Sequence, residues 1–321
     1  MRRQWIGLVV VVLLAVLLSA CGGGEPEAQS YTVGYLSTVP ELGLILDGFK
    51  EGMVELGYTE GENLTYLEEV VGSEELVAGA QALVDADVDL ILGLQNTEAL
   101  AAAELTEGIP IIFLMSFDPM IDGLVENLTK PGENLTGLVI PVFDLRRFQL
   151  MLEIDPSINH VYYPYDLGMD NKVLLEELEE LAAESNVELV AQGFTMETAT
   201  QIIEDTPDEI GAIFIGPDTA MAFTEDWVAA ANTRQALISW PLYTDNPDIV
   251  MGFGLDIFST GKQSARLADQ IFKGTAAGEL PVENVEALLS VSLVAADGIG
   301  LEVPDALLQR ADTILRAEDG N

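Results

Sequence analysis

Residues that could hold a small polar molecule recur in short loops, each directly after an apolar run of the chain. Ser37-Thr38 follows the first run, Gln95-Asn96-Thr97 a later one and Thr244-Asp245-Asn246 another. Hydroxyl, amide and carboxylate groups bind a ligand through hydrogen bonds and charge, without covalent chemistry. The same residue types also cap helices, so their repetition at equivalent places is what favours a binding site. The candidate ligand-binding residues, with aromatic residues able to stack on a ligand, are Ser37, Thr38, Gln95, Asn96, Thr97, Ser116, Phe117, Asp118, Phe143, Tyr165, Asp166, Asp218, Thr219, Asp245 and Asp256.

Groups that carry covalent catalysis are scarce in this sequence. His160 is the sole histidine and begins an apolar run, where a structural role is favoured over that of a base. No Gly-x-x-x-x-Gly-Lys loop or Gly-x-Gly-x-x-Gly turn follows any apolar run, so the phosphate-binding loops of nucleotide enzymes are missing from the sequence. A hydrolase with paired carboxylates stays open as an alternative, because acidic residues occur throughout. The sequence favours binding without catalysis, cofactor or metal.

Cys21, the single cysteine, ends a segment typical of protein export. Arg2 and Arg3 precede an uncharged apolar stretch over residues 5–18, which is shorter than the roughly 20 residues that cross a bilayer core. A basic start, an apolar middle and small residues before a cleavage site form the export signature, and the Leu18-Ser19-Ala20-Cys21 ending resembles a bacterial lipobox. We therefore expect a signal peptide at residues 1–20, and a lipidated Cys21 that begins a flexible tether over residues 21–30. A plain buried cysteine and an uncleaved signal anchor are the alternatives.

Length and charge limit the fold and the partners. The chain has 321 residues, of which 49% are hydrophobic, and a chain of this size usually divides its core into two lobes. With 13 basic and 54 acidic residues its formal charge is −41, and loss of the leader arginines makes it more negative by two. Such a surface repels nucleic acid and anionic headgroups. A solvated, salt-tolerant surface is favoured over cation binding, because no loop has calcium-binding spacing.

Short apolar runs alternate with segments of helical period, and this pattern restarts after Asp155-Pro156-Ser157-Ile158. Strands that are apolar throughout and separated by helices indicate parallel sheets covered on both faces. The sequence therefore predicts an α/β fold with two sheets in tandem. Such sheets bind ligands beyond the carboxyl ends of their strands. The expected strands are residues 32–37, 64–71, 90–94, 109–115, 135–140, 161–165, 187–194, 212–215, 240–243 and 249–255. The expected helices are residues 41–56, 74–84, 97–106, 171–185 and 219–232.

Several segments resemble a known family. They are Gly48-Phe49-Lys50-Glu51-Gly52-Met53 with Glu55-Leu56-Gly57-Tyr58 and Glu60-Gly61-Glu62-Asn63-Leu64, then Ile109-Pro110-Ile111-Ile112-Phe113 with Asp118-Pro119 and Gly123-Leu124-Val125, and then Lys130-Pro131-Gly132-Glu133-Asn134-Leu135-Thr136-Gly137. Together they resemble the extracytoplasmic substrate-binding lipoproteins of ATP-binding cassette (ABC) importers, in particular the group related to tryptophan- and tyrosine-binding proteins. The likeness extends from about Tyr31 to Val303 and is strongest in the first half.

The resemblance implies a type I periplasmic-binding-protein fold, in which two Rossmann-like lobes with parallel sheets are joined by three hinge crossings. By analogy the crossings lie near residues 139–143, 257–260 and 278–282, and a helix over residues 259–273 returns to the first lobe. The N-terminal lobe would then comprise residues 31–140 plus 258–278. The C-terminal lobe would comprise residues 141–257 plus 279–315, and residues 316–321 would form a tail.

The resemblance also implies how a ligand is held. In members that take amino acids, hydroxyls and helix N-terminal amides hold the carboxylate and acidic groups hold the ammonium. Asn96 and Thr97 occupy the family's small-residue loop, and Asp118 its Asp-Pro turn. Asp218, Asp245 and Asp256 match acidic residues of later strand-end segments. Three departures leave the ligand open: Gln95-Asn96-Thr97-Glu98 is bulkier than usual, Phe117 replaces a common Thr, and Gly216-Pro217-Asp218-Thr219 lacks the expected Asn.

Two functions of different classes fit these features. The first is a receptor that captures a small molecule and presents it to an ABC permease and its ATPase. The favoured ligand is an amino acid with an aromatic or branched side chain, and the next candidates are a purine-like molecule and a short peptide. The second is a sensory lipoprotein that signals occupancy without transport. In both cases we expect an exported monomer, held by lipid on Cys21 at the extracytoplasmic face of a membrane, with no nucleic acid partner.

Overall fold

The computed structural model describes residues 29–132, 134–168, 172–220 and 223–317, without the side chains of Asp218 and Ala220. The predicted signal peptide, Cys21 and most of the expected tether lie outside the described residues. Within those ranges, no helix is both long enough and apolar enough to cross a membrane.

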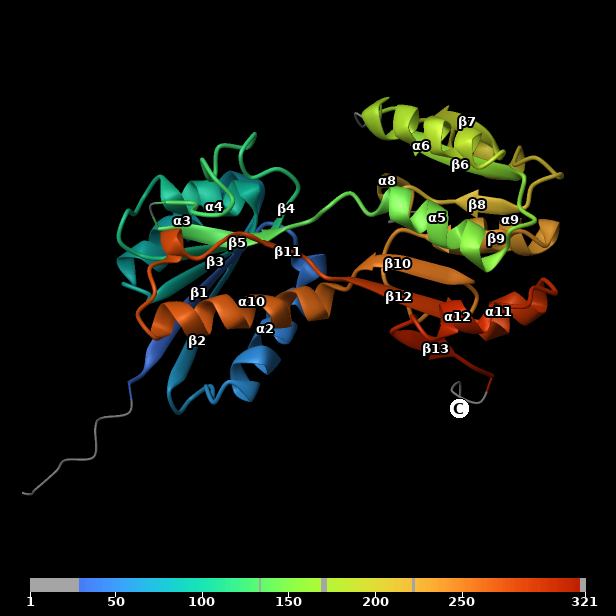
Figure 1. Cartoon of the computed structure of the whole chain (residues 1–321). Coiled ribbons are helices and arrows are strands. Elements are labelled where there is room, and N and C mark those ends of the chain that lie inside the picture. Colours follow the sequence, from blue (N-terminus) through green and yellow to red (C-terminus); the bar gives the residue numbers. More distant parts are fainter. Residues whose placement is uncertain (1–28, 133, 169–171, 221–222, 318–321) are drawn as a thin grey trace, which may run out of the picture.

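The first lobe is built on a six-stranded sheet of order β11-β5-β4-β3-β1-β2 (Figure 1). All neighbouring strands in it are parallel. Helices α2 and α10 contribute to the core on one face, and α3 and α4 to the core on the other. Its elements are β1 (Tyr31–Ser37), α2 (Leu44–Glu55), β2 (Leu64–Val70), α3 (Leu76–Asp85), β3 (Leu90–Gln95), α4 (Asn96–Ala103), β4 (Ile111–Ser116), β5 (Leu135–Val139), α10 (Ile257–Phe272) and β11 (Glu283–Asn284).

The second lobe is built on a seven-stranded sheet of order β13-β12-β10-β9-β8-β6-β7. It is parallel except where β12 runs antiparallel to β10. Its elements are α5 (Asp144–Ile154), β6 (His160–Asp166), α6 (Lys172–Glu184), β7 (Glu188–Phe194), α7 (Ala199–Glu204), β8 (Ala212–Phe214), α8 (Pro217–Ala220), α9 (Thr224–Arg234), β9 (Leu237–Trp240), β10 (Met251–Leu255), β12 (Ala287–Ser292), α11 (Leu293–Gly298), α12 (Asp305–Leu308) and β13 (Thr313–Leu315).

The central strands of each sheet are buried on both faces, which explains why they are mainly apolar, whereas the edge strand β2 is partly exposed and contains Glu68 and Glu69. In β3, Leu90, Leu92 and Leu94 enter the core beneath α2 and α10, whereas Ile91 enters the core beneath α3 and α4. Successive side chains of a strand point to opposite faces, so each central strand supplies both cores. The predicted α/β fold with two mostly parallel sheets is confirmed.

The chain passes between the lobes three times. It leaves the first sheet after β5 and leaves the second after β10. The third crossing was expected near residues 278–282, with the second lobe resuming at residue 279, and this expectation is wrong. Glu283 and Asn284 still pair with β5, and the Val285 N–H donates to the Val139 carbonyl at 2.8 Å. The chain therefore stays paired with the first sheet as far as Val285, and the third crossing lies between Val285 and the start of β12 at Ala287.

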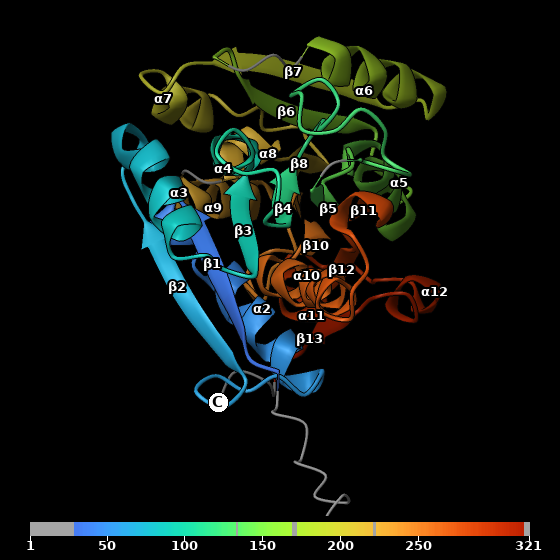
Figure 2. The ribbon, with the colours of Figure 1, turned by 90° about the vertical axis from the view of Figure 1, so that its left-hand side faces the viewer.

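Helix α10 follows β10 of the second sheet in the sequence but packs in the first lobe beside α2, as Figures 1 and 2 show. Glycines permit this close packing. A Cβ atom on Gly261 would lie 1.8 Å from the Ile45 carbonyl oxygen, and one on Gly48 would lie 1.9 Å from that of Phe258. The two helices therefore meet through backbone atoms, and α10 anchors the chain between the second and third crossings.

The largest error in the expected strands concerns residues 240–243. The observed strand β9 is Leu237–Trp240 and stops where Pro241 begins. Proline has no N–H for a sheet ladder, so the strand lies before it. The helices α5, α7, α11 and α12 and the strands β12 and β13 were not among the expected elements. The apolar patterns of the helices and of β13 are short or interrupted by charges, whereas β12 is an uncharged apolar run that the prediction missed.

Candidate functional site

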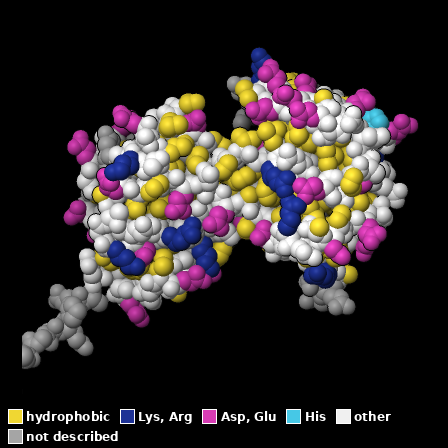
Figure 3. All heavy atoms as spheres, viewed as in Figure 1, with side chains coloured by type: hydrophobic (Ala, Val, Ile, Leu, Met, Phe, Trp, Pro, Cys, Tyr) yellow, Lys and Arg dark blue, Asp and Glu magenta, His cyan; other side chains and the backbone are white. Residues whose placement is uncertain are grey.

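The carboxyl ends of the two sheets face each other across an open cleft between the lobes (Figures 1 and 3). In parallel α/β sheets this edge carries the loops and helix N-termini that bind ligands. The candidate residues lie in separate loops of the sequence, and the fold brings these loops to the two sides of one cleft.

Glu98 organises the wall of the first lobe. Its side chain has no exposed surface, and one carboxylate oxygen accepts hydrogen bonds from Thr38 N at 2.9 Å and Thr38 Oγ1 at 2.6 Å. The other oxygen accepts from Thr97 Oγ1 at 2.8 Å and Gln95 N at 3.2 Å. Glu98 thus joins the loop after β1 to the start of α4, and three candidate residues belong to one hydrogen-bonded unit.

Two candidate polar atoms beside this unit are buried without a hydrogen-bond partner among the described residues: Ser116 Oγ and Asn96 Oδ1. Gln95 pairs with Met115 across β3 and β4, so Asn96, which directly follows β3, and Ser116, the last residue of β4, are adjacent to this pair. Asn96 also opens α4, and a helix N-terminus carries partial positive charge. Buried polar atoms are usually satisfied, so this pair is an unusual feature of the first wall.

The remaining polar candidates of the first lobe have structural partners. Ser37 Oγ accepts from the Val39 N–H at 3.0 Å and so shapes the loop after β1. The Asp118 carboxylate accepts from the N–H groups of Met120 and Ile121 at 3.2 and 3.0 Å. Asp256 Oδ1 accepts from Ser259 N at 2.7 Å and caps α10. These contacts position the loops and hinge helix of the cleft.

The second lobe brings other candidates to the opposite wall. Asp166 Oδ1 accepts from Gly168 N at 2.8 Å, and the buried Thr219 lies close to the Pro164 carbonyl, with Oγ1 at 3.4 Å. The Asp245 side chain is exposed. The backbone of Asp218 lies in α8, while its side chain lies outside the described part of the molecule.

The aromatic candidates differ in exposure. Phe117 is 71% exposed at the cleft, and the half-buried Tyr165 stacks on Tyr163 with ring centroids 5.9 Å apart. Phe143 makes an edge contact with Phe253, with centroids 6.0 Å apart, at the first crossing. Phe117 and Tyr165 are therefore the aromatic candidates in position to meet a ligand, and Phe143 lies at the hinge.

Arg147 is a buried residue of the second wall that the candidate set does not include. Its guanidinium donates to the Ser239 carbonyl at 2.8 Å, the Ile215 carbonyl at 2.7 Å and Asp144 Oδ1 at 2.6 Å, and it lies 3.6 Å from the centroid of the Phe214 ring. Burial lowers the pKa of Arg147, while Asp144 opposes that shift. These bonds hold the ends of β8 and β9, where two candidate loops begin.

Sequence reasoning missed Glu98 and Arg147 for different reasons. Glu98 follows Gln95 by three residues, and the two form a reciprocal capping box, which was a readable signal. Arg147 had no such signal, because its partners Ile215 and Ser239 are more than 60 residues away.

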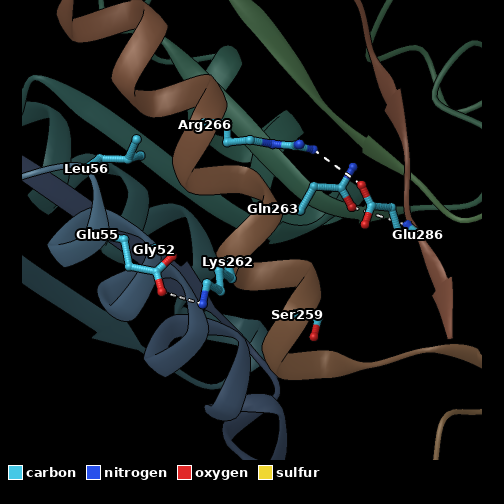
Figure 4. A pocket seen from close by; sticks show the side chains of 8 residues that line it. All are labelled: Gly52, Glu55, Leu56, Ser259, Lys262, Gln263, Arg266 and Glu286. Carbon is cyan, nitrogen blue, oxygen red and sulfur yellow. Dashed lines mark hydrogen bonds and ion pairs between the residues drawn. The ribbon is translucent and has the colours of Figure 1, made fainter. Parts of the chain in front are cut away.

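A separate groove of 520 Å³ lies between α2, α10 and the third crossing (Figure 4). Its basic side chains already have acidic partners: Lys262 lies 2.7 Å from Glu55, and Arg266 lies 3.3 Å from Glu283. Gln263 donates to the Asn284 carbonyl at 2.9 Å and thereby ties α10 to the crossing. No group of three or more potential metal ligands occurs within the described ranges. The cleft is therefore the better candidate for a small-molecule site.

Comparison with known proteins identifies the family. Residues 35–315 match the model of the ABC transporter substrate binding proteins. A tyrosine-binding protein of Clostridioides difficile is 23% identical over 268 residues, which span 81% of this chain and 77% of the relative.

Solved structures share the fold. The ligand-free, open form of a substrate-binding protein with adhesive properties from Clostridium difficile aligns with a TM-score of 0.74 at 20% identity, covering 89% of this chain and 99% of the other. The ABC domain from Streptococcus pneumonia in complex with L-Trp aligns with a TM-score of 0.69 at 21% identity, covering 89% and 100%. Two lobes, three crossings and the family match lead to one conclusion: this chain belongs to the ABC transporter substrate-binding proteins and has the type I periplasmic-binding-protein fold.

Proposed function

We propose that this protein captures an amino acid in the cleft and presents it to an ABC permease. The observation that carries the proposal is a pair of buried atoms, Ser116 Oγ and Asn96 Oδ1, beside the N-terminus of α4, which have no hydrogen-bond partner in the described part of the chain. The Ser116 hydroxyl and the helix N-terminus suit a carboxylate, and the Asn96 carbonyl oxygen suits an N–H donor such as an ammonium. Two similar proteins support the choice, since one is named for tyrosine and another was solved with L-Trp.

Both walls offer groups for the rest of such a ligand. Phe117 on the first wall and Tyr165 on the second offer rings for an aromatic or branched side chain. Asp166, Asp218 and Asp245 supply carboxylates for the ammonium group, and Asp118 and Asp256 hold the loops around them. Contacts made from both walls stabilise the closed form, so ligand binding shifts the lobes toward closure. A permease that recognises the closed form then receives a loaded receptor.

Isothermal calorimetry with L-tyrosine, L-tryptophan and L-leucine tests the proposal, with nucleosides and sugars as other classes. We expect saturable binding of an amino acid, and a melting temperature that rises with ligand concentration in the manner of a native-state ligand. Ser116→Ala should weaken that binding roughly tenfold, the effect of losing one hydrogen bond to a charged group. Ser185→Ala, an exposed serine after α6, is the matched control and should bind as the parent does.

Binding of a nucleoside or sugar in place of every amino acid would refute the proposed ligand class. Equal affinity in Ser116→Ala and Ser185→Ala would remove Ser116 from the site. Asp218→Ala and Asp245→Ala separately test the acidic residues that we assign to the ammonium.

The proposal includes export and a lipid anchor on Cys21. Substrate-binding proteins of ABC transporters act outside the cytoplasm, and the leader with its Leu-Ser-Ala-Cys ending supports a lipid-held form. Expression of the full chain in a bacterium should place it in the membrane fraction and label it with radioactive fatty acid. Cys21→Ser should abolish the label. A labelled Cys21→Ser variant, or an unlabelled parent chain, would contradict the anchor.

A further inference from the structure

A group of large apolar side chains is exposed in the turn after β4, on the first wall of the cleft. We call Phe117, Met120 and Ile121 the first lip; Ile121 is 83% exposed and Phe117 71%. The turn is nevertheless well tied, because Asp118 accepts hydrogen bonds from the N–H groups of Met120 and Ile121, and Asn96 donates to Asp122 next to them. Exposing such side chains to water is unfavourable, so a fixed turn that presents them is suited to apolar contact.

A second group lies on the opposite wall, after β6 and β7. We call Leu167, Val173 and Met196 the second lip; all three are exposed, Val173 by 67%. Leu167 is also fixed, since its N–H donates to the Phe194 carbonyl at 2.8 Å. A Cβ atom on Gly193 would lie 2.6 Å from Leu167 Cδ2, so the glycine lets the leucine rest on β7. The second lip is therefore a supported apolar surface as well.

The two lips belong to segments that border the same gap. Figure 1 shows the chain after β4 on the inner side of the first lobe and the start of α6 on the inner side of the second. Figure 3 shows hydrophobic side chains on both sides of the notch between the lobes. The facing positions place an exposed apolar surface on each side of the gap. A second copy of the chain is a poorer occupant, because the formal charge of −41 makes copies repel one another.

We propose that the first and second lips meet when the cleft closes and bury one another as an apolar latch. The proposal rests on the cleft closure that the proposed function requires. Phe117 borders the proposed ligand site, whereas the contact of Met120 and Ile121 with the second lip lies outside the ligand. Ligand affinity then depends in part on residues that do not touch the ligand. Salts that strengthen apolar association should then favour closure even without a ligand.

Cross-linking between introduced cysteines tests where the lips go. A form comprising residues 22–321 has no native cysteine, and every core residue lies after Ser30. In that form, Ile121→Cys with Val173→Cys joins the lips. Val54→Cys with Val173→Cys is the control, because Val54 is exposed on α2, outside the strand-end loops. A disulfide requires Cα atoms about 4.4–6.8 Å apart, so rapid bonding reports contact between the lips.

We expect the lip pair to form a monomeric disulfide faster than the control, both with a bound amino acid and in concentrated sodium sulfate. Slow bonding in both conditions would overturn the latch. Disulfide-linked dimers would overturn it in favour of a second copy. If an amino acid binds without bonding of the lips, the latch is wrong and the proposed function stands. If the lips form the disulfide in sulfate but no amino acid binds, the latch stands and the proposed function is wrong.

A second measurement tests the contribution of the apolar contact. The double variant Ile121→Ser with Val173→Ser should bind the cleft ligand roughly tenfold more weakly, as expected for the loss of buried apolar surface. Small-angle scattering should show less compaction of this variant on ligand addition. Val54→Ser should match the parent in both measurements. Unchanged affinity and compaction in the double variant would show that closure leaves the lips apart.

Discussion

At the residue scale, Glu98 is the side chain on which the first wall of the cleft depends most. It is fully buried and accepts four hydrogen bonds from Thr38, Gln95 and Thr97. Glu98→Gln replaces one accepting oxygen by an NH₂ group, which faces donors that it cannot satisfy. We expect a loss of roughly 3 kcal/mol in the free energy of unfolding, measured by urea denaturation. Glu104 is exposed just after the same helix, so Glu104→Gln should leave the free energy of unfolding almost unchanged.

Arg147 plays the corresponding part in the second wall. It is completely buried, pairs with Asp144 and donates to two backbone carbonyls. Arg147→Met would leave the Asp144 charge and both carbonyls without this partner, so we expect the free energy of unfolding to fall by about 3–5 kcal/mol. The neighbouring Arg146 is partly exposed, and Arg146→Met should change stability by less than about 1 kcal/mol. Similar losses in the two variants would contradict the structural role of the buried cation.

At the element scale, the α2–α10 pair holds the hinge helix in the first lobe. A Cβ atom on Gly261 would collide with the Ile45 carbonyl oxygen at 1.8 Å. Gly261→Ala should therefore push the helices apart and lower the free energy of unfolding by about 3 kcal/mol, at the upper end for overpacking. In Gly298→Ala the added Cβ atom in α11 would have no atom within 4 Å. This change should raise the free energy of unfolding by about 0.5–1 kcal/mol, because alanine favours the helix more than glycine does. Calorimetric melting compares the two, and a harmless Gly261→Ala would exclude backbone contact between these helices.

The sheet of the second lobe should show a pH dependence through Tyr162. Burial, assisted by Asp205, raises the pKa of its hydroxyl from 10.0 to about 12. The native state therefore favours the neutral phenol. The resulting stability is fully present below pH 10 and is lost as the pH rises through about 12. Tyr162→Phe removes hydrogen bonds to Gln192 and Ile202, so the free energy of unfolding of this variant should be lower by about 1 kcal/mol below pH 10. Urea unfolding should also show a shallower alkaline decline for this variant than for the parent, and an equal decline would contradict the assignment.

At the scale of the whole molecule, charge is the dominant feature. Acidic residues outnumber basic ones by 54 to 13, and two basic side chains, Lys262 and Arg266, each contact two acids. Repulsion among the remaining carboxylates opposes the compact state. Raising the ionic strength from about 0.1 M to 1 M shortens the Debye length from about 10 Å to 3 Å, so the urea midpoint should rise with KCl. A flat or falling midpoint in KCl would refute the argument.

Much of the fold was predictable because the signal is local. Runs such as residues 90–94 contain no polar side chain, and a strand buried on both faces requires that pattern. The helices between them show their own period, and the loops of candidate residues follow the strand ends. The two-sheet α/β fold therefore depends on neighbours in the sequence, and these are visible without coordinates. The candidate site was predictable as a set of loops, whereas the role of each side chain was not.

What the sequence by itself determined was the succession of strands and helices and the placing of polar residues at strand ends, because burial on both faces and chain reversal impose local residue patterns. What only the tertiary structure decided was which distant groups meet. Glu98 joins the loop after β1 to α4, Arg147 fastens two strand ends more than 60 residues away, and Glu283 stays in the first sheet by pairing with β5. These outcomes depend on the free energy of long-range packing and hydrogen bonding, which no short segment of sequence contains.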